Sequence, residues 1–227
     1  MARVFNGSSQ YLSASSTLLT NEPIDITVIA NADAATGVYT ALSLGNSGAA
    51  TGIYASNMRG DVASDPTETI KQSDAAASGI ARTSTGFTAA TWHALGSTFI
   101  SDTSRATFID GGSKVSDTTN VADPTPDYIT IGASRRSALA NYFDGSIAEA
   151  YVLDANMSDA VHASVALGYS PIWSAPLGNV RGWYPLQNDN NNRMAGGYPD
   201  LTATGSPTDV IHPFNVVYPS INGLITL

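Results

Sequence analysis

The sequence predicts an all-β protein, built as an antiparallel β-sandwich or jelly roll with one short helix. Short apolar or alternating runs recur along the 227 residues, and Gly, Asn, Asp and Pro interrupt them. Helical periodicity is almost absent and is confined to residues 159–167. The length suits one large all-β domain, which needs no disulfide or metal to fold.

The first half of the chain supplies several strands by alternation. Ile24, Ile26 and Val28 share one face of IDITVIANA, and YTALSLG continues this pattern. Two further strands are predicted in TWHALGSTFI and RATFIDGGSKVSD. The second of these contains Asp110–Gly112, where glycine supplies a positive φ without steric cost. We therefore expect a tight hairpin at this turn.

The second half adds DYITIGA, SIAEAYVLD and VRGWYPLQ as strands. Alternation divides SIAEAYVLD into two faces, one made of Ile147, Glu149 and Tyr151 and the other of Ala148, Ala150 and Val152. Because the second face is wholly small and apolar, we expect it to face the core.

One short helix is predicted over residues 159–167. Ser158 is a suitable N-cap, while Gly168 and Pro171 end the helix. The side chains expected to pack on the sandwich edge are Val161, Val165 and Leu167. We expect this helix to be a structural plug.

The domain organisation is predicted as one jelly-roll domain over residues 1–213, followed by an arm at 214–227. The arm is apolar, so it either serves oligomerisation or docking or packs back on its own domain. Residues 56–84 look like a loop or an irregular strand pair, and residues 187–200 are a loop rich in Asn and Gly.

Composition excludes several classes of function. The net charge is −9, and such a surface repels the phosphate backbone of nucleic acids. The chain has no Cys and hence no thiol chemistry. It has no apolar run long enough for a membrane span, and its N-terminus lacks an apolar run of signal-peptide length. We expect no membrane association and no export by an ordinary signal.

Four stretches resemble segments of one known family. An opening strand is matched by RVFNGSSQYLS, and a central hairpin by FTAATWHALGSTFISDTSRATFIDGGSKV. Closing strands and a helix are matched by YITIGASRRSALANYFDGSIAEAYVLDANMSDA, and a tail by GWYPLQNDNNNRMAGGYPDLTATGSP with His212-Pro213. Together they resemble the laminin-G-like, concanavalin-A-like jelly-roll domains of the phage-encoded type. Many members carry the Trp-Pro-Leu strand before the FDG strand, whereas here it comes last.

The resemblance covers most of residues 2–213 and implies a fold without implying one function. The fold hosts lectins, glycosidases, adhesion modules and virion parts. Retaining glycosidases of related folds commonly carry a Glu-x-Asp-x-x-Glu pattern, which is absent from this chain. Glu149 has Asp154 five residues on, on the opposite face of a strand, so we expect Glu149 to be a rim or surface carboxylate, paired with Arg135 or Arg136.

No other catalytic constellation is visible in the sequence. The three histidines, His93, His162 and His212, do not have the spacing of zinc ligands. We expect His93 to pack or to form hydrogen bonds beside a core Trp92. GYSPI lacks the second glycine of a nucleophile elbow. We therefore predict no enzyme activity and no catalytic residues.

The sequence leaves two kinds of ligand possible, calcium and a saccharide. Some family members bind calcium at the rim, and QNDNNN and SDTTNVADPTPD are oxygen-rich loops, although solvated turns are their expected role. The metal ligands are thus unknown, and we expect no cofactor. Exposed aromatic rings could form a platform for a sugar, and the candidates in or near loops are Tyr54, Tyr142, Tyr169 and Tyr198. Trp92 and Trp183 are expected in the core.

These observations predict a non-enzymatic structural or interaction protein. The favoured hypothesis is a phage virion component, such as a capsid decoration (cement) or fibre-associated protein. Its partners would be viral coat protein and further copies of itself, for example in a trimer, and its location the virion. The alternative is a lectin-like, carbohydrate-binding module for attachment to cell-surface glycans.

Overall fold

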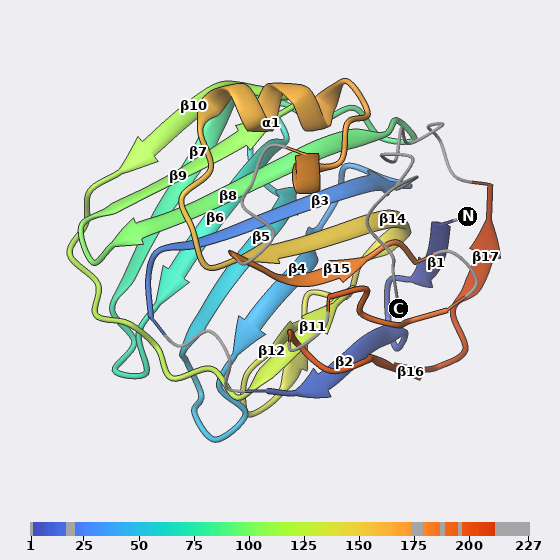
Figure 1. Cartoon of the computed structure of the whole chain (residues 1–227), viewed down its shortest axis with the longest axis horizontal. Coiled ribbons are helices and arrows are strands. Elements are labelled where there is room, and N and C mark those ends of the chain that lie inside the picture. Colours follow the sequence, from blue (N-terminus) through green and yellow to red (C-terminus); the bar gives the residue numbers. More distant parts are fainter. Residues whose placement is uncertain (1, 17–20, 174–178, 187–188, 195–196, 212–227) are drawn as a thin grey trace, which may run out of the picture.

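The computed structural model describes residues 2–16, 21–173, 179–186, 189–194 and 197–211. The described chain forms two large antiparallel sheets, which pack face to face as a β-sandwich (Figure 1). The predicted all-β fold class is therefore confirmed. No helix in these residues is long and apolar enough to cross a membrane.

The larger sheet has eight strands. Its order is β10-β9-β8-β3-β14-β1-β17, and β15 pairs with β14 beside this path. The strands are β1 (Ala2–Asn6), β3 (Ile24–Ala32), β8 (His93–Ser101), β9 (Ser104–Ile109), β10 (Gly112–Asp117), β14 (Asp144–Leu153), β15 (Val180–Tyr184) and β17 (Thr208–Val210). Both β1 and β15 are short, and they pair with different parts of the long β14.

The second sheet has seven strands in the order β16-β2-β11-β4-β5-β6-β7. They are β2 (Tyr11–Ser15), β4 (Val38–Gly45), β5 (Ile53–Arg59), β6 (Pro66–Gln72), β7 (Ser78–Gly86), β11 (Tyr128–Ile131) and β16 (Thr202–Thr204). A separate small hairpin is formed by β12 (Ser134–Arg135) and β13 (Leu139–Ala140). The irregular strand pair expected in residues 56–84 is present as β6 and β7, with a register shift between Pro66 and Glu68, and β7 continues to Gly86.

The main core lies between the two sheets, and alternation in the strands explains its membership. Ile24, Ile26 and Val28 of β3 are fully buried there, as are Ile129 and Ile131 of β11. Burial of aliphatic side chains on this scale is the main favourable term in folding. The predicted strands IDITVIANA and DYITIGA are therefore present, and the face that carries Ile24, Ile26 and Val28 points into the core.

The face prediction for β14 is correct only in part. Ala150 and Val152 belong to the main core, as expected, but Ile147 joins them and Ala148 does not. A register shift between Ile147 and Glu149 causes the exchange, because one extra residue reverses the alternation. Both faces of β14 are buried, since the outer face also packs against other segments.

The short helix α1 (Asp159–Ala166), the one α-helix of the described residues, lies across the outer face of the eight-stranded sheet (Figure 1). Val165 packs there on Ile29, Ala94 and Ala148. The predicted helix bounds are correct to within one residue, and its position is on a sheet face rather than at the sandwich edge. Leu167 is 77% exposed, which corrects the expectation that it is buried. A short 3₁₀ helix, Pro171–Trp173, follows.

Candidate functional site

A pocket opens on the outer face of the seven-stranded sheet, where β4, β5 and β6 lie side by side. The strand register aligns Thr40, Asn57 and Glu68 in one row across the three strands. The cavity has a volume of about 130 Å³. Its lining combines these strands with the segment 134–141, and consists of Val38, Thr40, Ile53, Ala55, Asn57, Arg59, Glu68, Ile70, Ser134, Arg136 and Asn141.

The pocket has an apolar floor and a polar wall held by hydrogen bonds. Ile53 and Ala55 are buried at the floor. The Thr40 hydroxyl donates to Asn57 Oδ1 at 2.8 Å, and Asn57 Nδ2 donates to Glu68 Oε1 at 3.0 Å. An amide held at both ends has one orientation, so the polar groups of this wall are fixed before any ligand arrives.

Glu68 is buried, and two arginines neutralise it. Arg59 Nη1 lies 2.6 Å and Arg82 Nε 2.7 Å from Glu68 Oε2. Arg59 also forms a two-pronged ion pair with Asp61, at 2.7 and 2.9 Å. The hydrogen bonds to Asp61 raise the pKa of Arg59 above its usual range, and they lower the pKa of Asp61. These four side chains carry no net charge together.

The hairpin of β12 and β13 forms the other wall. Ser43 Oγ donates to the Ala133 carbonyl at 3.0 Å and accepts from the Arg135 backbone N–H at 3.2 Å. A Cβ on Gly45 would overlap the Arg135 carbonyl, so glycine allows this close approach. The Arg136 guanidinium donates from Nη1 to Gln72 Oε1 at 3.0 Å and so reaches β6.

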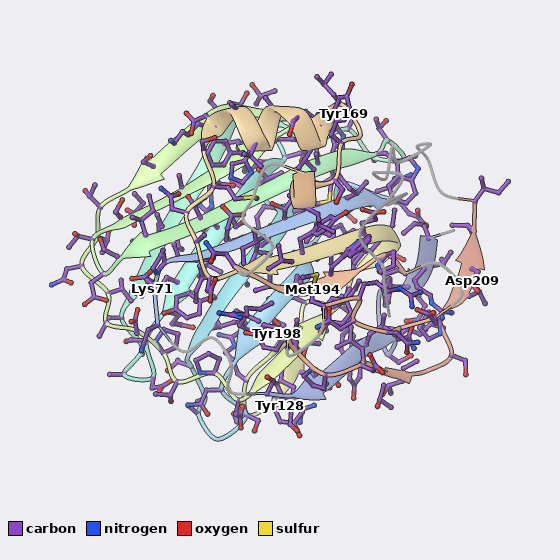
Figure 2. The ribbon with its side chains drawn as sticks, in the orientation of Figure 1. Lys71, Tyr128, Tyr169, Met194, Tyr198 and Asp209 are labelled. Atoms are coloured by element: carbon purple, nitrogen blue, oxygen red, sulfur yellow. The ribbon has the colours of Figure 1, made fainter. Side chains whose placement is uncertain are left out.

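A second polar cluster surrounds Lys71 at one end of the sandwich, which Figure 2 shows to be far from Asp209 of β17. Its ammonium nitrogen lies 2.9 Å from Glu22, 2.8 Å from Asp102 and 2.7 Å from Asp123. The Tyr54 hydroxyl donates to Asp123 at 2.7 Å. The three carboxylates come from three segments that are distant in sequence.

Burial governs the protonation of this cluster. It raises the pKa of Glu22 to about 7, against the lowering effect of Lys71. Burial also disfavours the charged forms of Lys71 and Asp123, but their hydrogen bonds outweigh it, so the pKa of Lys71 is raised and that of Asp123 lowered. Burial and the neighbouring Asp123 raise the pKa of Tyr54 well above its usual range.

Three carboxylates this close together are a possible metal-binding group. Here the Lys71 ammonium contacts all three carboxylates, and its own side chain is fully buried. We therefore interpret the three carboxylates as the ion-pair partners of Lys71 rather than as metal ligands. Asp123 comes from SDTTNVADPTPD, one of the two oxygen-rich loops, and residues 187–188 of the other loop lie outside the described chain.

Glu149 does not lie at the rim or on the surface, as the sequence predicts, but is buried on β14. It accepts a hydrogen bond from the Tyr151 hydroxyl, which also lies 3.1 Å from Ser170 Oγ. The expectation of a pair with Arg135 or Arg136 is wrong for this reason. Ser170, which follows α1, contacts the same Tyr151 hydroxyl, and no local pattern in the sequence predicts this contact.

The described histidines have structural partners. His93 Nδ1 lies 2.8 Å from Asp110, and its Nε2 accepts from the Thr88 backbone N–H at 3.0 Å, which confirms the expected hydrogen bonding. His162 is buried, stacks on Phe108 and lies 3.2 Å from Asp25. Both rings therefore position neighbouring elements. His212 lies outside the described residues.

The four candidate tyrosines do not form one platform. Tyr54 and Tyr198 are buried, and Tyr142 is half-buried beside Tyr11. Tyr169 is 48% exposed, beyond the end of α1 (Figure 2). The two tryptophans are half-buried rather than fully in the core: Trp92 packs below α1, and Trp183 stacks on Tyr151.

Sequence reasoning missed the pocket. Its side chains are spread over residues 38–70 and 134–141, and part of the first range has the composition of a loop. One signal was present, because Thr40, Asn57, Arg59 and Glu68 are polar residues within or beside strand-like runs. Their convergence depends on the pairing of β4, β5 and β6, which no local pattern specifies.

Comparison with known proteins establishes the fold. No family model and no curated protein matches the chain. A putative carbohydrate-binding protein from Bacteroides ovatus is similar at a TM-score of 0.64 and 15% identity, over 91% of this chain and 58% of that one. The chain therefore spans little more than half of that protein.

Two further solved structures are similar. The Ruminococcus gnavus IT-sialidase CBM40 bound to α2,3-sialyllactose has a TM-score of 0.57 and 13% identity, over 73% of this chain and 98% of that one. Domains LG4-5 of the mouse laminin α1 chain have a TM-score of 0.50 and 14% identity, over 66% of this chain and 40% of that one. The chain therefore has the laminin-G-like, concanavalin-A-like jelly-roll fold that the sequence resemblance implies.

Proposed function

We propose that this protein is a non-catalytic carbohydrate-binding domain, whose saccharide occupies the pocket on the outer face of the seven-stranded sheet. The observation that carries the proposal is the pocket itself, with an apolar floor at Ile53 and Ala55 and fixed polar groups around it. Pockets of this make-up, largely pre-formed, are typical of small-molecule sites. The volume of about 130 Å³ suits one sugar residue better than a long chain.

The similar structures support the same class of function. One is described as a putative carbohydrate-binding protein, and another is a CBM40 in complex with sialyllactose. The second belongs to a sialidase, so such modules also occur within enzymes. In this chain the buried Glu68 is neutralised by two arginines, an arrangement that favours binding over general acid catalysis.

The virion hypothesis stays a prediction. The three similar structures reported above are not described as virion proteins, and coat protein as a partner is untested. The apolar arm at 214–227, on which that hypothesis partly rests, lies outside the described residues.

The proposal is tested by filling the pocket. Ala55→Phe places a large ring at the buried floor, and Ala75→Phe makes the same change in the exposed β6–β7 turn. Binding would be measured on a panel of neutral and acidic saccharides, with thermal unfolding as a check of folding. We expect the wild type and Ala75→Phe to bind the same saccharides and Ala55→Phe to lose them. Equal binding by folded Ala55→Phe would overturn the proposed site.

A further inference from the structure

Among the described residues, the ion pairs leave two cations without a carboxylate partner. The chain has ten Lys and Arg and nineteen Asp and Glu, so acidic partners are in excess. All ten cations lie in the described residues, and eight of them form ion pairs with a carboxylate: Arg3, Arg59, Lys71, Arg82, Arg105, Lys114, Arg181 and Arg193. The remaining two are Arg135 and Arg136, adjacent at the turn of the β12–β13 hairpin.

These two arginines have different surroundings. The Arg135 guanidinium carbon lies 3.9 Å from the centroid of the Tyr128 ring, a cation–π contact outside the pocket. Arg136 lines the pocket, and its side chain donates to the neutral amide of Gln72. Arg136 therefore has a hydrogen-bond partner that holds it in place, and its charge has no counter-ion among the described residues.

The pocket consequently differs in charge from the molecule around it. Arg59 and Arg82 are balanced by Asp61 and Glu68, so Arg136 leaves a local charge of about +1. The whole chain carries −9. A guanidinium without a counter-ion in an acidic protein favours an anionic group from outside, because a charge-assisted hydrogen bond is stronger than a neutral one.

We propose that the pocket selects saccharides that carry a carboxylate, and that Arg136 binds this carboxylate. The inference rests on the proposed carbohydrate-binding function and adds the class of ligand. A planar guanidinium presents two parallel N–H groups to a carboxylate, which a lysine ammonium cannot do. Asn141 also lines the pocket and is half-buried, so its amide is available to a sugar hydroxyl beside Arg136.

The test compares matched saccharides on the full chain by isothermal titration calorimetry. The probes are 3′-sialyllactose against lactose, and oligogalacturonate against the same oligosaccharide with its carboxyl groups reduced. A glycan array with neutral, carboxylated and sulfated saccharides extends the comparison. We expect a carboxylated probe to bind about tenfold or more tightly than its neutral counterpart, the difference expected for one charge-assisted contact.

Three variants locate the effect. Arg136→Gln removes the charge and should abolish the preference. Gln72→Glu keeps the shape of the side chain but gives Arg136 a carboxylate of its own, so it should also abolish the preference. Arg135→Gln makes the same change of net charge outside the pocket and should leave the preference within about twofold of the wild type.

The possible results separate a failure of the ligand class, a failure of the role of Arg136 and a failure of the proposed function. Binding of neutral saccharides in the pocket without a preference for acidic ones would overturn the ligand class and leave the proposed function intact. A preference for sulfated over carboxylated saccharides would overturn the inference too. If no saccharide on the array binds, both the inference and the proposed function fail. An equal loss in Arg135→Gln and Arg136→Gln would point to overall charge and overturn the role of Arg136.

Discussion

Lys71 lies between the two sheets, and its fully buried side chain ends among three carboxylates. A buried ammonium group loses its hydration water, so fixed partners must take the place of that water. Here Glu22, Asp102 and Asp123 do so. Removing the cation would leave these carboxylates facing one another. The cost of breaking a buried ion pair is larger than the net stability of the pair itself.

We therefore expect Lys71→Met to lower the free energy of unfolding by about 3 kcal/mol, as for other buried pairs that lose one partner. Lys114→Met is the matched control. Lys114 pairs with Asp159 at the surface and its side chain is 43% exposed, so the loss should stay below about 1 kcal/mol. Urea unfolding at pH 7 measures both variants. Similar losses in the two would contradict the account of the cluster.

At the scale of elements, the β9–β10 hairpin combines a tight turn with a close contact. Asp110 and Gly111 both have positive φ, at 50° and 69°, as a two-residue hairpin loop of type I′ requires. A Cβ on Gly111 would also overlap the backbone of Ala163 in α1. The turn thus fixes the position of the helix as well as that of the two strands.

We expect Gly111→Ala to destabilise the protein by about 2 kcal/mol or more, from backbone strain and the displacement of α1. Gly112→Ala makes the same change one residue on, where a Cβ meets no atom within 4 Å. That control should change stability by less than about 1 kcal/mol. Thermal unfolding monitored by circular dichroism compares them, and a milder effect at Gly111 than at Gly112 would refute the argument.

Elements that depend on local signals could be predicted from the sequence. The Asp110–Gly112 turn and the helix after Ser158 have such signals, and both are present as expected. Elements that depend on their surroundings could not. The register shift in β14 moves Ile147 into the core, and Glu149 is buried beside Tyr151, whose hydroxyl also contacts Ser170. No pattern within the strand itself predicts either feature.

At the scale of the whole molecule, the pocket and the lysine cluster both arise from sheet topology. Glu68 and Lys71 are three residues apart on β6, so alternation sends them to opposite faces of the sheet. Glu68 then meets Arg59 and Arg82 outside the sandwich, while Lys71 meets carboxylates from three other segments inside it. The sequence specifies the alternation, but the partners follow from strand order, which single-sequence patterns do not determine.

The pH dependence of stability follows from the lysine cluster. Burial raises the pKa of Glu22 from 4.5 to about 7, so the folded state holds this proton more tightly than the unfolded state. The corresponding stability is fully present below pH 4.5 and is lost as the pH rises through 7. The pKa of Asp123 is lowered, so its contribution to stability is present above about pH 4 and is lost as the pH falls below that value.

We therefore expect the free energy of unfolding of the wild type to fall by about 2 kcal/mol between pH 5 and pH 8, since a tenfold change in proton affinity is worth about 1.4 kcal/mol. Glu22→Gln resembles the protonated side chain at every pH, and Glu22 Oε1 has no hydrogen-bond partner that the change would remove. Its stability should therefore vary less over this range. Urea unfolding at pH 5, 6, 7 and 8 gives both curves, and contributions from the other titrating groups cancel in their difference. A constant difference across the four pH values would show that Glu22 is not the group that titrates.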